Sequence, residues 1–392
     1  MEIKLAYGRD KITVQVPASV EVHTYSSRPV ERPVDYAVFK TAFNKSGAGS
    51  FLSSGQPLVV VNDGYRRTPT ARTLDWLDRL DRTLLDRASF LVATGAHNLP
   101  TEEHLRKIFG SFIERVKPRL FSHDARDRES LYRLGYDRMG GEVLVNRLIR
   151  DSKKVFIIGS VEPHYFAGFT GGCKSLFPGV ADLATIERNH NLANSLEAAP
   201  LKVEDNPVAE HLWSLYDLLD EKKFCTVQLV ADGAGQTAAV FFGDLRNAFR
   251  EASTCARTIF APPLKMCYDV VLCEVRSPLD KNLYQAQKAL ENCQEAVIDG
   301  GEAVVVSACE EGVGSEYFFD LAGKWDVKQN RACDGRLHFG SHKLSRVNTM
   351  RRRIGVRLHS ELDDAVVRRV FYDPVGDLND YLNQKTKDRD KM

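Results

Sequence analysis

The chain has 392 residues, with 54 Lys and Arg against 53 Asp and Glu, and hydrophobic residues make up 43% of it. The net charge of +1 excludes a global field that would gather nucleic acid or an anionic membrane, and the average composition excludes a long disordered protein. At about 150 residues per domain, the length predicts two or three domains that each bury a core.

The apolar runs and the cysteines indicate the setting of the chain. No run approaches the roughly 20 apolar residues that span a membrane, and Met1 to Leu5 show no apolar stretch typical of a secretory signal. The eight cysteines include no Cys-x-x-Cys pair and are too few for a disulfide scaffold. We therefore expect a cytoplasmic protein without nucleic-acid or membrane partners, in which most thiols are buried as small apolar groups.

The N-terminal part predicts a hairpin followed by alternating strands and helices. Residues 1–17 alternate in polarity around Gly8, which is typical of a hairpin. Strands are predicted at 57–61, 89–93, 154–159, 225–231 and 238–242, and helices at 70–84, 101–109, 141–151 and 244–258. Thr70 and Thr101 are the expected N-caps of the first two helices. Continuous apolar strands alternating with amphipathic helices favour a doubly wound parallel sheet.

A second α/β set follows Ala261-Pro262-Pro263, the best linker candidate in the chain. Its predicted strands are 268–274, 302–307, 354–359 and 366–371, and its predicted helices are 282–293, 342–352 and 376–384. We therefore predict two α/β domains with mainly parallel sheets and an active-site cleft between them. The N-terminal catalytic domain would span 1–263 and the C-terminal domain 264–392, whose final helix is a candidate to pack back on the first domain.

Ligand sites in such sheets lie beyond the carboxyl ends of strands, and two polar clusters occupy such positions. Asp63 and Arg66 follow the strand at 57–61, where a guanidinium suits bidentate binding of a carboxylate or phosphate. A polar loop in which Arg66 pairs with Asp63 is an equally good explanation. His97 follows the strand at 89–93 and is a candidate acid or base, because histidine titrates near neutral pH. The alternative for His97 is a cap or a surface residue.

The cluster at residues 159–175 is the richest in candidate residues. It contains His164, Gly168, Gly171, Gly172 and Lys174, and His190 follows sixteen residues after the lysine. Glycines let a backbone approach a ligand closely. The segment nearly fits a P-loop, but Cys173 occupies the second obligatory glycine, and the predicted strand ends well before Gly168. Ordinary nucleoside triphosphate hydrolysis is therefore a minority alternative.

A fourth cluster opens the first predicted helix of the second domain. Asn282 is the expected N-cap, and Gln285 and Lys288 are three residues apart, so they share one helix face. The helix dipole makes this N-terminal face suitable for an anionic group. A solvated amphipathic helix is the alternative.

Together the four clusters resemble the nickel-dependent lactate racemase family, whose members use a nickel-pincer nucleotide. The most specific motif is Pro163-His164-x4-Gly168-Phe169-x-Gly171-Gly172-x-Lys174 with His190, and the resemblance extends from Asp63-x-x-Arg66 to Gly340-x-His342-Lys343. It implies a racemase or epimerase that inverts Cα of a 2-hydroxy acid by reversible hydride transfer to the cofactor. Cofactor maturation enzymes are implied as partners.

The resemblance also implies a role for each candidate residue. Lys174 would carry the cofactor covalently, as pyridinium-3-thioamide-5-thiocarboxylic acid mononucleotide nickel, and His190 would bind the nickel. His97 and His164 would be the paired acid and base. The other implied roles are substrate binding for Arg66, Gln285 and Lys288, and cofactor binding for Asp63, Gly168, Gly171 and Gly172. Asp63 is also a candidate to orient one of the histidines.

Two departures from the family pattern concern the substrate. Tyr65-Arg66-Arg67-Thr68 stands where Thr-Arg-Pro is more usual, and residues 337–343 stand where lactate-specific members carry a Trp-bearing segment. Arg67, with His342 or Lys343, would permit a second carboxylate or a polyhydroxylated chain. Malate, hydroxyglutarate or an aldonic acid is therefore as well supported as lactate, although a surface salt bridge is an equal explanation of Arg67. The alternative function is a nucleotide- or phosphate-binding protein of the same fold, in which Lys174 acts only as a cation.

Overall fold

The computed structural model describes residues 1–336, 338 and 340–389. Leu337 and Phe339, in the segment 337–343 that differs from the family pattern, therefore lie outside the described residues. The chain divides into two compact units. Residues 26–262 form the first, here called the continuous unit. Residues 1–25 and 263–392 form the second, here called the split unit.

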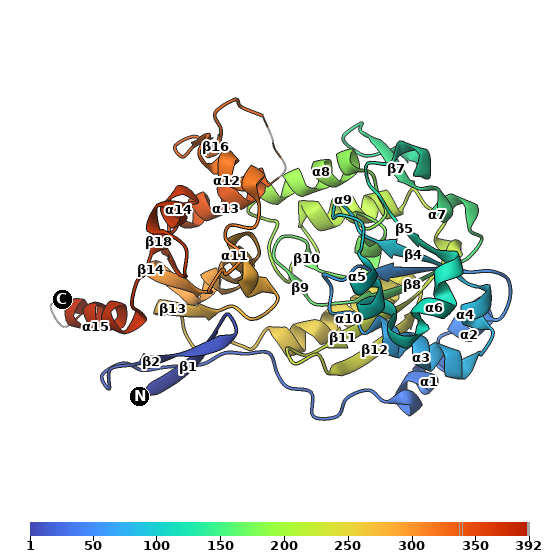
Figure 1. Ribbon diagram of the computed structural model, residues 1–392, viewed down its shortest axis with the longest axis horizontal. Coiled ribbons are helices and arrows are strands. Elements are labelled where there is room, and N and C mark those ends of the chain that lie inside the picture. The colour runs from blue at the N-terminus through green and yellow to red at the C-terminus, as the bar shows by residue number, and fades with distance from the viewer. Residues whose placement is uncertain (337, 339, 390–392) are drawn as a thin grey trace. The chain divides into compact units, whose positions relative to one another are not determined.

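A six-stranded sheet in the order β12-β11-β8-β3-β4-β5 lies at the centre of the continuous unit (Figure 1). Its strands are β3 (Leu58–Asn62), β4 (Ser89–Ala93), β5 (Leu120–Ser122), β8 (Val155–Ser160), β11 (Phe224–Ala231) and β12 (Thr237–Gly243). β3, β4, β5, β8 and β11 form a parallel set, which confirms the predicted parallel sheet, although no strand was predicted at β5. β12 is antiparallel to β11, because the short connection at 232–236 allows a hairpin but no crossover helix.

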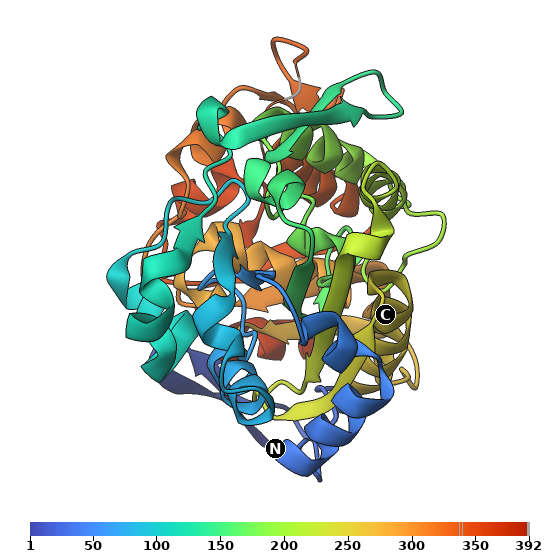
Figure 2. The same ribbon diagram turned by 90° about the vertical axis from the view of Figure 1, so that its right-hand side faces the viewer.

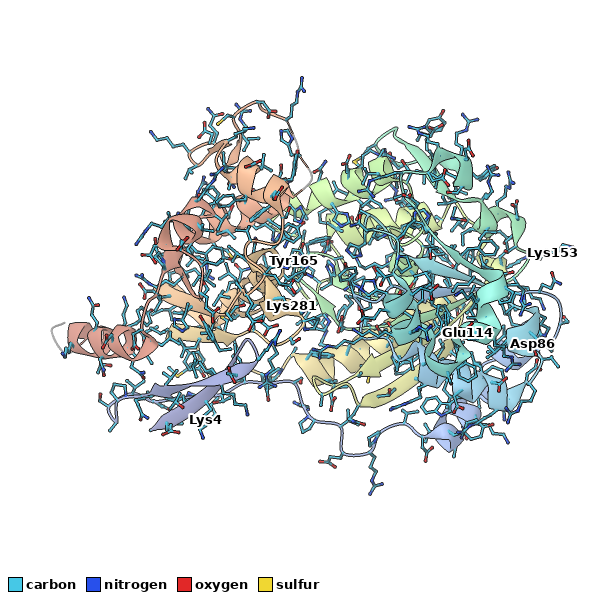
Figure 3. The ribbon with its side chains drawn as sticks, in the orientation of Figure 1. Lys4, Asp86, Glu114, Lys153, Tyr165 and Lys281 are labelled. Atoms are coloured by element: carbon cyan, nitrogen blue, oxygen red, sulfur yellow. A yellow bond between two sulfur atoms is a disulfide. The ribbon has the colours of Figure 1, made fainter. Side chains whose placement is uncertain are left out.

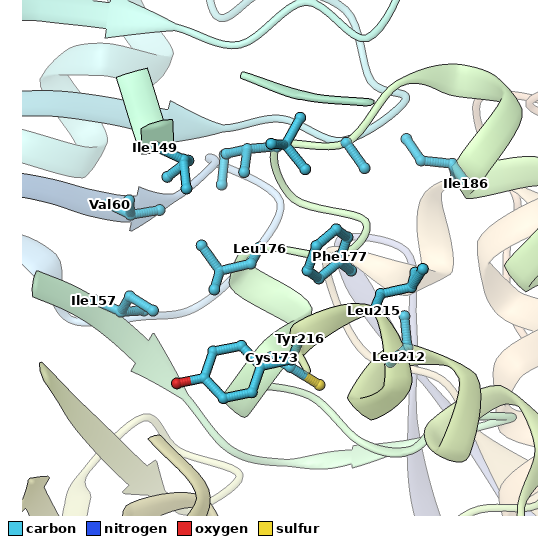
Figure 4. Close-up of a cluster of buried hydrophobic side chains, with 14 of the residues drawn as sticks. Val60, Ile149, Ile157, Cys173, Leu176, Phe177, Ile186, Leu212, Leu215 and Tyr216 are labelled. Atoms are coloured by element: carbon cyan, nitrogen blue, oxygen red, sulfur yellow. The ribbon is translucent and has the colours of Figure 1, made fainter. Parts of the chain in front are cut away.

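Both faces of this sheet are covered by helices (Figures 1 and 2). Val59 and Val61 of β3 join the core cluster of one face, whereas Leu58 and Val60 join that of the other, because side chains alternate along a strand. The first face carries α1 (Tyr36–Lys45), α2 (Ala48–Leu52), α3 (Thr70–Leu80), α4 (Leu84–Arg87), α5 (Glu102–Phe109) and α6 (Ile113–Val116). The second carries α7 (Arg147–Asp151), α8 (Leu183–Asn191) and α9 (Pro207–Tyr216), and Figure 4 shows part of its core. Burial on both faces explains the uninterrupted apolar strands.

The remaining elements of the continuous unit are two hairpins and a long helix. β6 (Leu131–Tyr136) pairs with β7 (Glu142–Asn146), and β9 (Pro163–His164) pairs with β10 (Gly168–Phe169). The helix α10 (Leu245–Phe260) buries Phe249 and Ala252 in a cluster with Val161 and Phe169. This cluster anchors the segment that follows β8.

The split unit contains a parallel sheet in the order β13-β14-β17-β18. Its strands are β13 (Tyr268–Glu274), β14 (Val297–Val306), β17 (Gly355–His359) and β18 (Asp373–Pro374). Its helices are α11 (Leu283–Cys293), α12 (Glu316–Ala322), α13 (Ser341–Met350), α14 (Asp364–Arg369) and α15 (Leu378–Arg389), and β15 (Trp325–Asp326) pairs with β16 (Arg331–Ala332). The predicted second α/β set is therefore present, with a parallel sheet.

The predicted N-terminal hairpin is present but belongs to the split unit. β1 (Glu2–Tyr7) and β2 (Asp10–Gln15) bury Leu5 and Val14 against side chains of β14, and the Ala6 amide donates to Glu274 at 2.7 Å. The Gln15 amide donates to Asn379 of α15 at 2.6 Å. The predicted domain 1–263 is therefore wrong for its first 25 residues, because the apolar face of the hairpin is buried against the second sheet. The final helix contacts this hairpin within its own unit.

Three local predictions are also wrong. Residues 141–151 do not form one helix, because β7 pairs with β6 before α7 begins. Residues 366–371 are not a strand, since α14 uses Val367 as its buried position. Thr70 is the first residue of α3 and makes no capping hydrogen bond. The caps at Thr101 and Asn282 are confirmed, since their side chains accept the His104 and Gln285 amides.

The described residues contain no helix that is both long and apolar enough to cross a bilayer. A disulfide joins Cys273 and Cys293, a pair that the sequence did not predict. Cys173, Cys225 and Cys309 are buried free thiols, as expected for small apolar groups.

Candidate active site

The predicted clusters of the continuous unit meet at the point where the winding of the sheet reverses. From β3 the chain proceeds through β4 to β5 on one side, and from β8 it proceeds to β11 on the other. Asp63 and Arg66 follow β3, His97 follows β4, and the segment with His164 and Lys174 follows β8. The carboxyl edge at such a reversal is the usual ligand site of doubly wound sheets.

His97 forms a close pair with Asp63. Its Nδ1 lies 2.6 Å from Oδ2 of Asp63, and the other carboxylate oxygen accepts the Tyr65 amide at 3.2 Å. The Asp63 side chain is 8% exposed and that of His97 is 51% exposed. An ionised carboxylate only accepts hydrogen bonds, so Nδ1 carries the proton and the lone pair of the neutral imidazole is on Nε2. The structure thus gives His97 the tautomer of a base.

Arg66 makes its ion pair with a residue that the sequence analysis did not single out. Its Nη1 lies 4.0 Å from Oε1 of Glu162, whereas the Asp63 carboxylate is bound to His97. The loop after β3 is thereby linked to the loop after β8. The guanidinium is about one third exposed, so this pair leaves it able to bind an anion as well. Arg67 is exposed and its Nη1 donates to the Gly233 carbonyl at 3.4 Å.

The ring of Phe166 gathers three of the predicted residues. Its centroid lies 4.5 Å from the ring of His164, 5.2 Å from the ring of His190 and 5.6 Å from Nζ of Lys174. Phe166 itself is 1% exposed. Side chains from β9, from the turn that carries Lys174 and from α8 therefore surround one buried aromatic side chain. Phe166 could not be singled out from the sequence, where it is only an apolar residue inside a polar motif.

His164 and His190 are held by backbone groups in different tautomers. The Ala167 amide donates to Nδ1 of His164 at 3.3 Å, so a neutral His164 carries its proton on Nε2. Nδ1 of His190 donates to the Ile186 carbonyl at 2.8 Å, which leaves the lone pair on Nε2. A backbone carbonyl that fixes one ring nitrogen is typical of metal-binding histidines. His190 therefore fits a nickel ligand.

Lys174 lies in a tight 3₁₀ turn, Gly172–Ser175, after the β9–β10 hairpin. It lines a small cavity together with apolar groups that include Trp213 and Phe249. No α-helix starts at this turn, so it lacks the helix N-terminus that binds phosphate in a P-loop. Burial raises the pKa of the adjacent Cys173 to about 12, so its thiol is neutral at physiological pH. Figure 4 shows this thiol in the core, beside Tyr216 and Leu212.

A chain of side-chain hydrogen bonds ties the Lys174 turn to the loop after β3. Ser175 Oγ donates to Asn62 Oδ1 at 3.4 Å, and Asn62 Nδ2 donates to Thr68 Oγ1 at 2.8 Å. The Thr68 and Ser160 hydroxyl oxygens are 2.7 Å apart. These four residues fix the loop carrying Asp63 and Arg66 against that carrying Lys174. Their role could not be predicted, because isolated polar side chains at strand ends give no specific signal.

Protein packing explains why glycines occupy the motif after His164. Gly171 has φ 76° and ψ −162°, and a Cβ there would lie 2.6 Å from Gln228 Oε1. A Cβ at Gly172 would lie 2.6 Å from the Phe249 ring, and one at Gly168 would collide with the Lys202 carbonyl. Cofactor binding by these three glycines stays a prediction.

Gln285 and Lys288 lie together on α11 of the split unit. Lys288 Nζ donates to Gln285 Oε1 at 2.6 Å, which confirms their shared helix face. The expectation that Lys343 could take a second substrate carboxylate is wrong, because this side chain is 2% exposed and its Nζ donates to the Tyr284 carbonyl at 2.8 Å. His342 is also buried.

Comparison with known proteins identifies relatives along most of the chain. The family described as lactate racemase N-terminal domain matches residues 7–200, and that described as lactate racemase C-terminal domain matches residues 265–339. Lactate racemase from Lactiplantibacillus plantarum is 27% identical over 344 residues, which are 83% of this chain and 80% of that protein. Lactate racemase from Thermoanaerobacterium thermosaccharolyticum is 26% identical over 331 residues, 81% of this chain and 76% of that protein.

The solved structures give the same result for the fold. The lactate racemase apoprotein from Thermoanaerobacterium thermosaccharolyticum matches with a TM-score of 0.83 and 21% identity, over 99% of this chain and 95% of that chain. Sheet topology and site define a two-unit α/β protein with a carboxylate–histidine pair and a lysine at the reversal of its main sheet. The sequence matches then specify the group: the chain belongs to the lactate racemase family.

Proposed function

We propose that this protein is an isomerase, a racemase or epimerase that inverts Cα of a 2-hydroxy acid with a covalently bound nickel-pincer nucleotide. Membership in the lactate racemase family supports the reaction class. The observation that carries the proposal is the 2.6 Å pair of His97 with Asp63, which lies at the sheet edge where the His164–Lys174 segment also begins.

The two histidines would move the hydroxyl proton of the substrate. Nε2 of His97 has the lone pair that can accept this proton, while a neutral His164 holds a proton on Nε2. For the opposite enantiomer His164 must accept the proton, which requires it to give up the 3.3 Å hydrogen bond from Ala167. At 3.3 Å this hydrogen bond is longer than the usual N–H hydrogen bond.

Three cationic or polar side chains would hold the substrate. We assign the carboxylate to Arg66, whose planar guanidinium suits bidentate binding. Gln285 and Lys288 would bind the hydroxyl and stabilise negative charge that develops on its oxygen. Their 2.6 Å hydrogen bond supports this assignment, because it holds the two groups close enough to contact one small anion.

The cofactor would be attached through the Lys174 amine, and Nε2 of His190 would be the protein ligand to nickel. A neutral imidazole is a good donor to nickel, and the Ile186 carbonyl holds the ring in the required tautomer. When bound, the cofactor supplies the hydride acceptor that these residues lack. Loading by maturation enzymes in the cytoplasm belongs to this proposal.

Lactate and larger 2-hydroxy acids are both candidate substrates. Lys343 and His342 give no support to a second-carboxylate site, because both are buried. Arg67 remains a candidate for a dicarboxylate or an aldonic acid. Its contact with Gly233 is an exposed hydrogen bond of 3.4 Å, which a carboxylate could replace.

The test uses protein produced together with the maturation enzymes. Enantiopure lactate, malate, 2-hydroxyglutarate and gluconate are incubated with it, and chiral chromatography follows inversion. A substrate deuterated at Cα should keep its label during inversion if hydride transfer operates. Loss of the label to water would refute hydride transfer, and failure to invert any acid by protein with a verified adduct would refute the racemase proposal.

A matched pair of lysine variants controls this experiment. Lys174→Ala should abolish both the mass adduct and inversion. Lys153→Ala should leave both unchanged, because Lys153 is an exposed lysine of the same unit (Figure 3). An adduct-free wild-type protein that binds nucleotides but inverts no acid would instead support the alternative function, in which Lys174 is only a cation.

A further inference from the structure

Lys343 is a fully buried lysine for which the proposed function has no part. It is the third residue of α13 and is 2% exposed. A lysine is rarely buried unless its amine is bound. Burial lowers the pKa of Lys343 well below its ordinary value, and repulsion from Lys288 lowers it further. The position therefore needs an explanation from its contacts.

Lys343 binds the first turn of α11. Its Nζ donates to the Tyr284 carbonyl at 2.8 Å and lies 4.2 Å from the centroid of the Tyr284 ring. In return, Gln287 Nε2 of α11 donates to the Lys343 carbonyl at 2.8 Å. Burial raises the pKa of Tyr284 to about 12, so the ring that faces the amine is a neutral phenol. The two helices are thus joined at both the side chain and the backbone of Lys343.

The bound turn is the one that presents the candidate substrate groups. Tyr284 immediately precedes Gln285 and lies one helical turn before Lys288. Lys288 in turn donates to Gln285 at 2.6 Å. A shift of the Tyr284 backbone would therefore move both side chains. Substrate binding weakens strongly when the groups that contact the substrate are misplaced by about 1 Å.

A second contact joins the same two helices away from the candidate substrate groups. Arg346 of α13 forms a bidentate ion pair with Glu291 of α11, with both bonds at 2.7 Å, and both side chains are buried. This pair joins α11 beyond Lys288, in the half of the helix that carries no candidate substrate group. Lys343 differs from Arg346 because it contacts the first turn of α11, which carries Gln285.

We propose that Lys343 is a positioning residue that holds the first turn of α11 and thereby places Gln285 and Lys288 for the substrate. The inference rests on the proposed function, in which these two residues bind the 2-hydroxy acid. It assigns to the Gly340-x-His342-Lys343 segment a role in support of α11, in place of direct contact with a substrate carboxylate.

The test is a double-mutant cycle on the cofactor-loaded enzyme. Lys343→Met removes the amine and keeps the apolar stem, and it should raise KM about tenfold, the loss expected for one misplaced hydrogen-bonding group. Lys288→Met should raise KM as well. In the Lys288→Met background, Lys343→Met should raise KM by a smaller factor than it does in the wild type, because one of the two groups that it positions is already absent.

The matched control is Lys281→Met. Lys281, labelled in Figure 3, lies in the turn before α11 and forms an exposed ion pair with Glu311 at 3.0 Å. Such a pair contributes little, so KM should stay within about twofold of the wild type. Hydrogen exchange should rise at the amides of 284–288 in Lys343→Met but not in Lys281→Met. If Lys343→Met does not fold, Lys343→Gln replaces it.

The outcomes separate this inference from the proposed function. A loaded wild-type protein that inverts no acid would refute the proposed function. An active wild type, with a folded Lys343→Met variant whose KM is unchanged or whose effect multiplies fully with that of Lys288→Met, would refute the positioning role alone.

Discussion

The contact between Asp63 and His97 allows a sharp prediction for Asp63→Asn. The asparagine keeps an oxygen for the Tyr65 amide, which now donates at 3.2 Å, and turns its amide nitrogen toward His97 Nδ1. An amide N–H can only donate, so Nδ1 must accept and the imidazole proton moves to Nε2. His97 then lacks the lone pair that would accept the hydroxyl proton of the substrate.

The expected loss follows from the strength of the contact. A hydrogen bond of 2.6 Å from an imidazole to a buried carboxylate is charge-assisted, and such bonds contribute about 1.5–3 kcal/mol. At about 1.4 kcal/mol per factor of ten, kcat should fall about 10- to 150-fold. KM should change little, because Asp63 binds no part of the substrate in the proposed mechanism. Asp63→Ala should be less impaired than Asp63→Asn, because water at Nδ1 does not force the wrong tautomer.

The assay is the initial rate of inversion of each enantiomer, followed by chiral chromatography. Rates are normalised to cofactor occupancy from the intact mass, so that a loading defect is not mistaken for a catalytic one. Equal kcat for Asp63→Asn and wild type at equal occupancy would show that the carboxylate does not set the tautomer of His97.

Three further predictions concern the acid stability, the metal and the motif glycines. Burial alone would raise the pKa of Glu302, but hydrogen bonds, led by that from Arg357, lower the pKa to about 2. The ionised carboxylate therefore adds about 3 kcal/mol to the free energy of unfolding above pH 4.5, and this contribution is lost as the pH falls toward 2. Glu302→Gln should therefore lower the free energy of unfolding at pH 7 and flatten its fall between pH 5 and 2 in urea titrations, and parallel pH profiles of the two proteins would contradict this. His190→Ala should keep the mass adduct and lose nickel, whereas Lys174→Ala should lose both, as measured by intact mass and metal analysis; nickel retained by His190→Ala at wild-type affinity would rule out its role as ligand. Gly171→Ala should lower stability by about 2 kcal/mol or more, because φ of 76° and the contact with Gln228 leave no place for a Cβ, and an unchanged melting temperature would contradict this.

Five of the six strands of the main sheet could be predicted because their burial is local in sequence, whereas the short edge strand β5 was not predicted. The predicted strand at 89–93 has the same bounds as β4, and the predicted strand at 57–61 begins and ends one residue before β3. Residues 141–151 could not be divided correctly, because the pairing of β7 depends on β6. In the site, His97 could be predicted from its place after a strand, but its bond to Asp63 depends on two strands lying side by side.

Residues that support the site were the least predictable. Phe166 gathers His164, Lys174 and His190, yet its sequence neighbourhood gives it no distinguishing pattern. Lys343 was a candidate to take a second substrate carboxylate, because it lies in the segment that departs from the family pattern. Its actual partner, Tyr284, is remote in sequence and belongs to another helix. A side chain that positions another residue has no characteristic sequence spacing from which its role could be predicted.

The placement of residues 1–25 in the split unit determines the order in which the protein can be completed during synthesis. The hairpin at residues 2–15 leaves the ribosome before the rest of this sequence, but its apolar residues are covered by β14 and α15. At about 5–20 residues per second, the hairpin waits on the order of tens of seconds for these partners, while residues 26–262 can already fold. A tag or truncation at residues 1–15 should therefore destabilise the split unit, most of which is synthesised last, before it affects the continuous unit.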